Sequence, residues 1–186
     1  SLNADYKFLK FIRQKCKKEK MILIFDECTS GFRQVFGGLH KLYNIEPDIA
    51  VFGKSLGNGF AISAVLGKKR IMKCSENSFI SSTFWSERVG YVAALETLSQ
   101  MDKTQSWKKI SELGIYFRKI LKDLAEKNGI NIKIKGLLAI PSFLIQNDIN
   151  NIYKTFITQE MLKNGFIISD AVYISISHNK IIFKKF

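Results

Sequence analysis

Two residues of this chain have types and positions that allow them to do chemistry together, Asp26 and Lys54. Asp26 follows the apolar run 21–25, which predicts a buried parallel strand with a carboxylate at its carboxyl end. Lys54 lies in the glycine-rich loop 53–59, directly after a second predicted strand at 48–52. In open α/β sheets, ligands bind outside the carboxyl ends of the strands, so we expect both side chains to face one crevice.

A buried carboxylate beside a partly desolvated lysine amine suits pyridoxal 5'-phosphate chemistry. The amine forms an imine with the cofactor, and the carboxylate keeps the pyridine nitrogen protonated so that the ring can take up electrons. A surface lysine and a loop-capping aspartate are the plainer alternative. A P-loop nucleoside triphosphatase is a further, less favoured one, because Gly53-Lys54-Ser55 matches the end of a phosphate loop. That loop requires glycine where this chain has Asp48.

The surrounding pattern alternates strands with helices, which is typical of an α/β sheet covered by helices. The predicted elements are a helix at 5–19, a short helix at 39–43, a strand at 61–66, and helices at 86–101 (with Ser86 as N-cap) and 103–127. Beyond Gly129 the pattern changes to short strands at 130–134 and 137–145, a helix at 149–164 and strands through 168 and 172–177. We therefore predict two domains, 1–101 and 102–186, the second a small α+β domain.

The composition is that of a globular protein with 186 residues and a formal net charge of +13. Its lysines are scattered and only five residues are arginine, so we interpret the basic run 15–20 as a solvated helix end and expect no nucleic-acid partner. The three cysteines form no Cys-x-x-Cys pair, which favours free thiols and a cytoplasmic protein. We find no apolar run of membrane-spanning length and no signal peptide, and expect neither a membrane partner nor a metal.

Four blocks of sequence, in order and at suitable spacing, resemble the class III pyridoxal-phosphate aminotransferases. Residues 23–33 are similar to that family's apolar strand, its Asp-Glu-Val and its Thr-Gly-Phe-Arg. The blocks that follow are 46–60, which resembles the Pro-Asp strand and Gly-Lys loop, 64–72, and 81–87, which resembles the Thr-Phe segment. The resemblance is strongest to the glutamate-1-semialdehyde aminomutase-like branch, although 82–86 is bulkier than in those enzymes.

This resemblance implies a fold-type-I transferase, with part of the mixed sheet of the large domain, its covering helices and the small domain. It implies that Lys54 forms the Schiff base and that Asp26 pairs with the pyridine nitrogen. Cys28 stands where the family has valine, and packs against the cofactor or is simply a buried thiol. Thr83 is expected to bind the cofactor phosphate of a neighbouring subunit, which implies a homodimer with shared sites.

Other polar residues receive more modest roles. We expect Glu27 to orient its loop, and Arg33 to anchor that loop in preference to binding a substrate carboxylate. His40 and His178 match no catalytic position of the family, so we place them in the core or on the surface.

The function implied is transfer of an amino group, as a transaminase or an aminomutase, between a small amino donor and a carbonyl acceptor. The family's phosphate-binding Gly-Ser/Thr loop and ring-stacking aromatic have no counterpart in the chain, which resembles the carboxyl-terminal part of such an enzyme. A non-catalytic remnant or a split subunit is the alternative. We also expect apolar surface to be exposed on strands 22–66, with poor solubility and weak cofactor binding by the chain alone.

Overall fold

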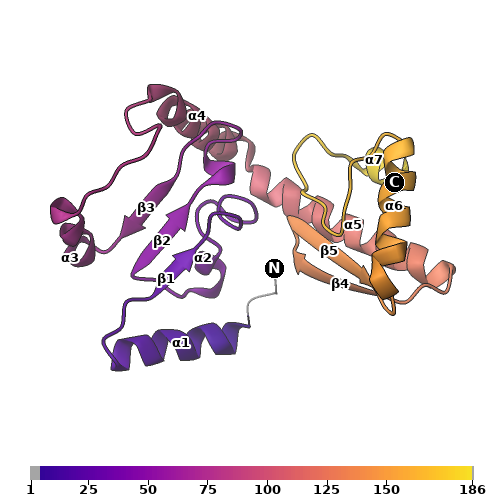
Figure 1. The fold of residues 1–186 in the computed structure, drawn as a ribbon, viewed down its shortest axis with the longest axis horizontal. Helices are drawn as coiled ribbons and strands as arrows, with labels where there is room; N and C mark the ends of the chain where they lie inside the picture. Colours follow the sequence, from indigo (N-terminus) through magenta and orange to yellow (C-terminus); the bar gives the residue numbers. More distant parts are fainter. Residues whose placement is uncertain (1–4, 186) are drawn as a thin grey trace. The chain divides into compact units, whose positions relative to one another are not determined.

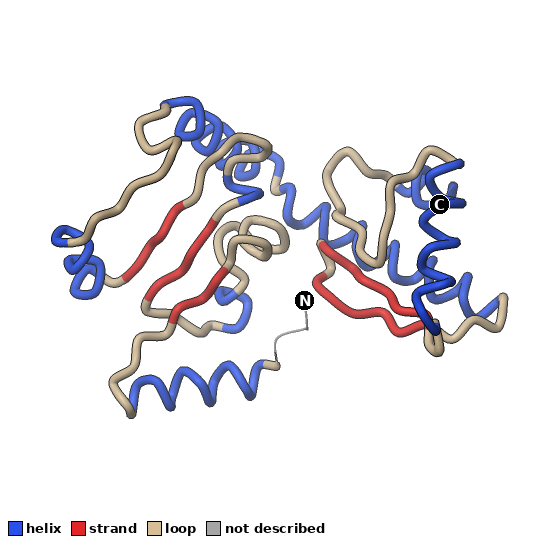
Figure 2. Tube along the Cα trace, viewed as in Figure 1, coloured by secondary structure: helices blue, strands red, loops and turns tan. Residues whose placement is uncertain are grey.

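The computed structural model describes residues 5–185, which form two compact units, 5–107 and 108–185. The first unit contains a three-stranded sheet with helices, and the second contains a two-stranded sheet with helices (Figures 1 and 2). The division lies within the long helix α5 (Ser106–Lys127). None of the helices in the described range is long and apolar enough to cross a membrane.

The sheet of the first unit is mixed, as the family resemblance of the sequence implies. Its strands are β1 (Ile24–Asp26), β2 (Ile49–Phe52) and β3 (Ala64–Gly67), in the spatial order β1-β2-β3. β1 runs parallel to β2, and β3 runs antiparallel to it. Because β1 and β2 are parallel, Asp26 at the end of β1 and the loop that follows Phe52 lie at the same edge of the sheet. We call this the carboxyl edge.

The prediction that the first strand is buried is wrong for the described chain. β1 is an edge strand with a single neighbour, and Ile22 and Ile24 are 53% and 55% exposed. The residues that do become buried are on β2, whose Ala50 and Phe52 pack with Leu56 and Ala94 in one apolar cluster. An apolar run indicates a strand suited to burial on both faces, but it does not say which elements cover it.

Helices precede, connect and follow the strands of this sheet (Figure 1). They are α1 (Tyr6–Lys18), α2 (His40–Tyr43), α3 (Lys69–Met72) and α4 (Arg88–Thr104). Asp5 caps α1 by accepting hydrogen bonds from the Lys7 and Phe8 amides. The expected Ser86 cap of α4 is not formed: the N-cap is Glu87, and it makes no side-chain capping bond.

The second unit packs α5 against an antiparallel hairpin. The hairpin strands are β4 (Ile132–Leu137) and β5 (Ile140–Ile145), and the helices α6 (Ile152–Lys163) and α7 (Lys180–Lys185) follow. Gly114 allows α5 to approach the hairpin closely, since a Cβ there would lie 2.0 Å from the Leu138 carbonyl oxygen. The core of this unit is formed by Leu113, Phe117, Ile174 and Phe183.

The strands expected through 168 and 172–177 do not form. This segment runs beside β5 in one isolated bridge between Ser142 and Ala171, with the Val172 and Ile174 amides donating to backbone carbonyls of the hairpin. The Val172 amide donates to the Pro141 carbonyl at 3.0 Å. Proline has no N–H, so Pro141 cannot return the second bond of a regular ladder.

Candidate functional site

The structure brings Asp26 and Lys54 to the carboxyl edge of the sheet, as their spacing predicts. Asp26 ends β1 in register with Val51 of β2, and Lys54 begins a short 3-10 helix (Lys54–Leu56) just after β2. The Lys54 Nζ donates a hydrogen bond of 2.7 Å to Thr29 Oγ1, in the loop that leaves β1. The amine and the carboxylate are near enough for Lys54 to help lower the pKa of Asp26.

The Asp26 carboxylate is held in its anionic form. The Cys28 backbone N–H donates to Oδ1 at 3.0 Å, and this bond is the largest cause of a pKa below the usual aspartate range. The Cys28 thiol and the Lys54 ammonium lower the pKa of Asp26 further. A carboxylate that stays ionised well below neutral pH is suited to holding a proton on a basic nitrogen of a ligand.

Cys28 contacts Asp26 and packs beside the loop that carries Lys54. Burial and the neighbouring Asp26 raise the pKa of its thiol, so Cys28 is protonated at neutral pH. A Cβ placed on Gly53 would lie 3.4 Å from Cys28 Sγ, so the thiol packs against the loop that carries Lys54. A neutral, half-buried thiol in this position packs as a small apolar group rather than acting as a nucleophile.

The backbone of Lys54 adopts the left-handed conformation, with φ of 44°. For a residue with a Cβ this conformation costs about 1–2 kcal/mol. The short 3-10 helix holds it in place, because Leu56 is buried in the core cluster of the first unit. Strain of this kind that the fold maintains is found preferentially at functional sites.

The burial predicted for the pair is not present. Asp26 and Lys54 are both exposed, whereas the sequence predicts a buried carboxylate and a partly desolvated amine. β1 is an edge strand of the sheet, with β2 as its single neighbour, and Asp26 at its end is exposed.

Glu27 orients the loop after β1, as predicted, and does so as a buried clamp. Its Oε1 accepts hydrogen bonds of 3.0 Å from both the backbone N–H and the Nδ1 of His40, and its Oε2 accepts one from the Ser30 hydroxyl. Glu27 and His40 are both buried. The clamp joins the two ends of the loop 27–40 and thereby positions Thr29, the partner of Lys54.

Arg33 also acts within this loop, in agreement with the anchoring role. Its Nε donates to the Thr29 carbonyl at 2.7 Å. His178 belongs to the other unit, where its Nδ1 accepts from the Ser175 amide and its ring stacks on Phe183. The residue that sequence reasoning missed is Thr29. The sequence feature that could have indicated Thr29 is its hydroxyl group, three residues after Asp26 in a loop expected to face Lys54.

Thr83 is not brought to this site. It is exposed in the long loop that connects the 3-10 turn Lys73–Asn77 to α4 (Figure 2). Its proposed contact is to a neighbouring subunit, so its role stays a prediction. In the part of the chain that the structure describes, no group of three or more His, Cys, Asp or Glu side chains could hold a metal ion.

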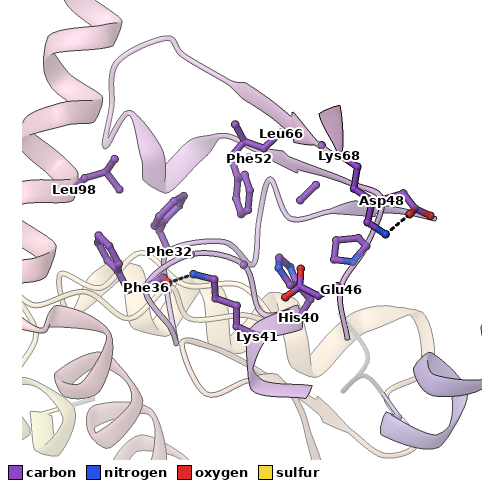
Figure 3. Close-up of a pocket in the computed structure, with 15 residues that line it drawn as sticks. Phe32, Phe36, His40, Lys41, Glu46, Asp48, Phe52, Leu66, Lys68 and Leu98 are labelled. Carbon is purple, nitrogen blue, oxygen red and sulfur yellow. Dashed lines mark hydrogen bonds and ion pairs between the residues drawn. The ribbon is translucent and has the colours of Figure 1, made fainter. Parts of the chain in front are cut away.

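A cavity of about 500 Å³ lies along β2 (Figure 3). Aromatic and aliphatic side chains, among them Phe32, Phe36 and Phe52, line much of it. The Lys41 amine points to the Phe36 carbonyl and donates to it at 3.3 Å. None of the four predicted site residues lines this cavity, so it is separate from the Asp26–Lys54 pair.

Comparisons with known proteins agree with the motifs at this edge. The family model of aminotransferase class-III matches residues 2–180. A 3-aminobutyryl-CoA aminotransferase of Cloacimonas acidaminovorans is 31% identical over 153 residues, which are 82% of this chain and 37% of that protein. A glutamate-1-semialdehyde 2,1-aminomutase of Thermodesulfovibrio yellowstonii is 30% identical over 190 residues, 93% of this chain and 44% of that protein. The chain thus spans less than half the length of these curated relatives.

Solved structures agree on the fold. The FumI protein of Sphingopyxis sp. MTA144 superposes with a TM-score of 0.92 at 24% identity, covering 98% of this chain and 44% of its own. A β-phenylalanine aminotransferase from Variovorax paradoxus gives a TM-score of 0.89 at 18% identity, covering 99% of this chain and 46% of its own. The fold is therefore the mixed α/β fold of the fold-type-I transferases. With a family model that matches nearly its whole length, this chain belongs to the class-III aminotransferases.

Proposed function

We propose that this chain carries the lysine and the carboxylate of a pyridoxal-phosphate-dependent enzyme that transfers amino groups, as a transaminase or an aminomutase. The observation that carries the proposal is the placement of Asp26 and Lys54 at the ends of two adjacent parallel strands. Membership of the class-III family supports the same cofactor.

The residues at the carboxyl edge fit this cofactor. Asp26 is an anion, as a partner of a pyridinium nitrogen must be, and Lys54 offers an exposed amine that donates to the Thr29 hydroxyl. The neutral Cys28 thiol provides a small apolar flank beside them. When bound, pyridoxal phosphate supplies an electron-accepting ring for the bond-breaking step at the substrate carbon.

The roles of the chain's own residues follow from their positions. Lys54 Nζ attaches the cofactor and, when free, carries a proton to and from the substrate carbon. Thr29 Oγ1 holds that nitrogen in place when no ligand does. Asp26 keeps a proton on the pyridine nitrogen, and Thr83 donates its hydroxyl to the cofactor phosphate of a second subunit. The working unit is accordingly a homodimer. The cytoplasm is proposed as its location because the three cysteines are free thiols.

The substrates proposed are a small-molecule amino donor and a carbonyl acceptor. One relative described above is an aminotransferase and another is an aminomutase, so the proposal covers both kinds of amino-group transfer. The rival function, a non-catalytic remnant or split subunit, is favoured by the exposure of Asp26 and Lys54.

Absorbance of the lysine-bound cofactor separates these functions. The full-length protein is incubated with pyridoxal phosphate and scanned, in parallel with Lys54→Ala and with Lys127→Ala, an exposed lysine at the end of α5. We expect the band in the wild type and the control and its loss in Lys54→Ala. A band that survives in Lys54→Ala rejects Lys54 as the attachment site, and no band in the wild type supports the remnant.

A further inference from the structure

A groove of about 710 Å³ lies at the opposite edge of the sheet from Lys54, where β1 and β2 begin. One wall is α1, which lies beside this end of the sheet, and the other is the turn from β3 into α3 (Figure 1). The four residues of β2 separate it from the Lys54 loop, which is about 13 Å of strand. The groove is therefore distinct from the proposed cofactor site.

The groove is strongly basic. Its lining includes six cations and only two carboxylates, Glu46 and Asp48. The cations are Lys10, Arg13, Lys17, Lys20, Lys68 and Arg70. Two of the five arginines of the whole chain thus lie at this one place.

The basic wall of α1 follows from helical spacing. Lys10, Arg13 and Lys17 are separated by three and four residues, so they share one face of the helix, and that face lines the groove. Within the basic run of the sequence, Lys15 pairs with Glu19 at 2.9 Å and is not part of the lining.

A buried carboxylate at the base of the groove joins its two walls. Asp48 is 3% exposed and pairs with Arg13 of α1 at 2.9 Å and with Lys68 beyond β3 at 2.6 Å. It also accepts the Leu23 amide at 2.9 Å. Asp48 therefore neutralises one cation from each wall and fixes both side chains in place.

The other four cations, on both walls, have no carboxylate partner among the described residues. Like charges gathered around one groove raise its electrostatic free energy, and an anionic ligand between the walls relieves this repulsion. The volume is that of a small-molecule site. Tyr6, with Lys10 Nζ 5.9 Å from its ring centroid, is the single aromatic residue in the lining. A nucleic-acid strand requires several stacking residues in succession, whereas one aromatic side chain suits one base.

We propose that this groove binds a nucleotide bearing two or three phosphates, with the phosphates between Lys17, Lys20 and Arg70, cations that Asp48 does not neutralise, and the base beside Tyr6. The proposal rests on the geometry of the groove and does not depend on the cofactor chemistry at Lys54.

The test measures ATP binding to the full-length protein by isothermal titration calorimetry at low and physiological salt. The variant reverses three charges of the groove, Lys17→Glu, Lys20→Glu and Arg70→Glu. The control reverses three exposed lysines elsewhere, Lys103→Glu, Lys127→Glu and Lys184→Glu, so that both proteins lose the same net charge. Cofactor absorbance and circular dichroism check that both variants are folded, and the milder pair Lys17→Ala with Arg70→Ala replaces the triple variant if it is not.

We expect ATP to bind the wild type and the control alike, with affinity reduced by about 30-fold or more in the groove variant. Tripolyphosphate should bind more weakly than ATP, and adenosine should not bind measurably. Equal loss of ATP affinity in the two triple variants would overturn the proposal, since it would reflect net charge alone. Absence of ATP binding at low salt would also overturn the proposal. A single-stranded RNA 12-mer that binds about tenfold more tightly than ATP, and that ATP displaces, would overturn it as well.

Discussion

The proposed chemistry depends most strongly on the negative charge of Asp26. Its pKa is lowered by the Cys28 amide and by Lys54, so its carboxylate is ionised through the whole neutral range. Asp26→Asn keeps the shape but removes the charge that holds a proton on the pyridine nitrogen. We predict that this variant of the full-length protein transfers amino groups about 100-fold more slowly.

The rate is measured with an amino donor that the wild type accepts, and Asp123→Asn, an exposed aspartate on α5, is the matched control. An Asp26→Asn variant as fast as the control is inconsistent with the pyridinium role.

Residue types and spacing were sufficient to predict that Asp26 and Lys54 lie at the same edge of the sheet, because two apolar runs with polar ends imply two parallel strands that end at one edge. They were insufficient for Thr29. Its contact with Lys54 depends on the turn after Glu27, and that turn is set by side-chain bonds to His40, 13 positions along the chain.

The Glu27 clamp holds the two ends of the loop 27–40 together through its hydrogen bonds to Ser30 and His40. Glu27→Ala removes both acceptor oxygens and leaves the buried His40 N–H groups without a partner, which costs about 1–3 kcal/mol. We predict that amide hydrogen exchange in 27–40 accelerates about tenfold or more, while α5 amides are unchanged. His40→Leu should behave like Glu27→Ala, and His40→Gln should restore protection by returning a donor. Identical exchange in Glu27→Ala and wild type would contradict the clamp.

Asp48 joins α1, the start of β1 and the end of β3, and it makes stability depend on pH. Its pKa lies far below the usual aspartate range, chiefly because the Leu23 amide and Lys68 donate to it. A group whose pKa is lowered on folding stabilises the folded state above its unfolded pKa of about 3.9, and this contribution is lost as the pH falls further. We predict that Asp48→Asn destabilises the protein by about 3 kcal/mol at pH 7.

The same substitution should flatten the loss of stability between pH 5 and pH 3, roughly the range in which an unperturbed aspartate titrates. Urea unfolding at several pH values measures both effects, with Asp123→Asn as control. If the free energy of unfolding of Asp48→Asn falls with pH as steeply as that of the wild type, Asp48 is not the source of the acid sensitivity.

The elements themselves were more predictable than their surroundings. The strands at 48–52 and 61–66 and the helices α1, α2 and α4 were predicted from the sequence pattern, with ends that shift by a few residues, whereas α3 was not predicted. The edge position of β1 could not be predicted, because its apolar run does not specify its neighbours. No regular strand forms at 172–177 because Pro141, the residue of β5 that faces this segment, has no N–H to donate. This pairing is tertiary, and no local sequence pattern encodes it.

The solubility of the 186-residue chain depends on the apolar surface that its three-stranded sheet exposes. Ile22, Ile24, Val65 and Leu66 are each about half exposed or more. Surfaces of this kind associate in water, at an edge strand above all. We predict that the 186-residue chain alone elutes from size exclusion as aggregates and that Ile24→Thr with Leu66→Thr shifts it toward monomer. A sharp monomer peak from the unsubstituted chain, carrying bound cofactor, would contradict this prediction.

Borohydride reduction is the most direct test of Lys54 as the residue that holds the cofactor. Reduction of the full-length protein loaded with pyridoxal phosphate fixes the cofactor on the lysine that binds it, and peptide mass spectrometry then locates the modified residue. We predict one stoichiometric modification, on the peptide that contains Lys54. A stoichiometric modification on any other lysine, with Lys54 unmodified, would contradict it.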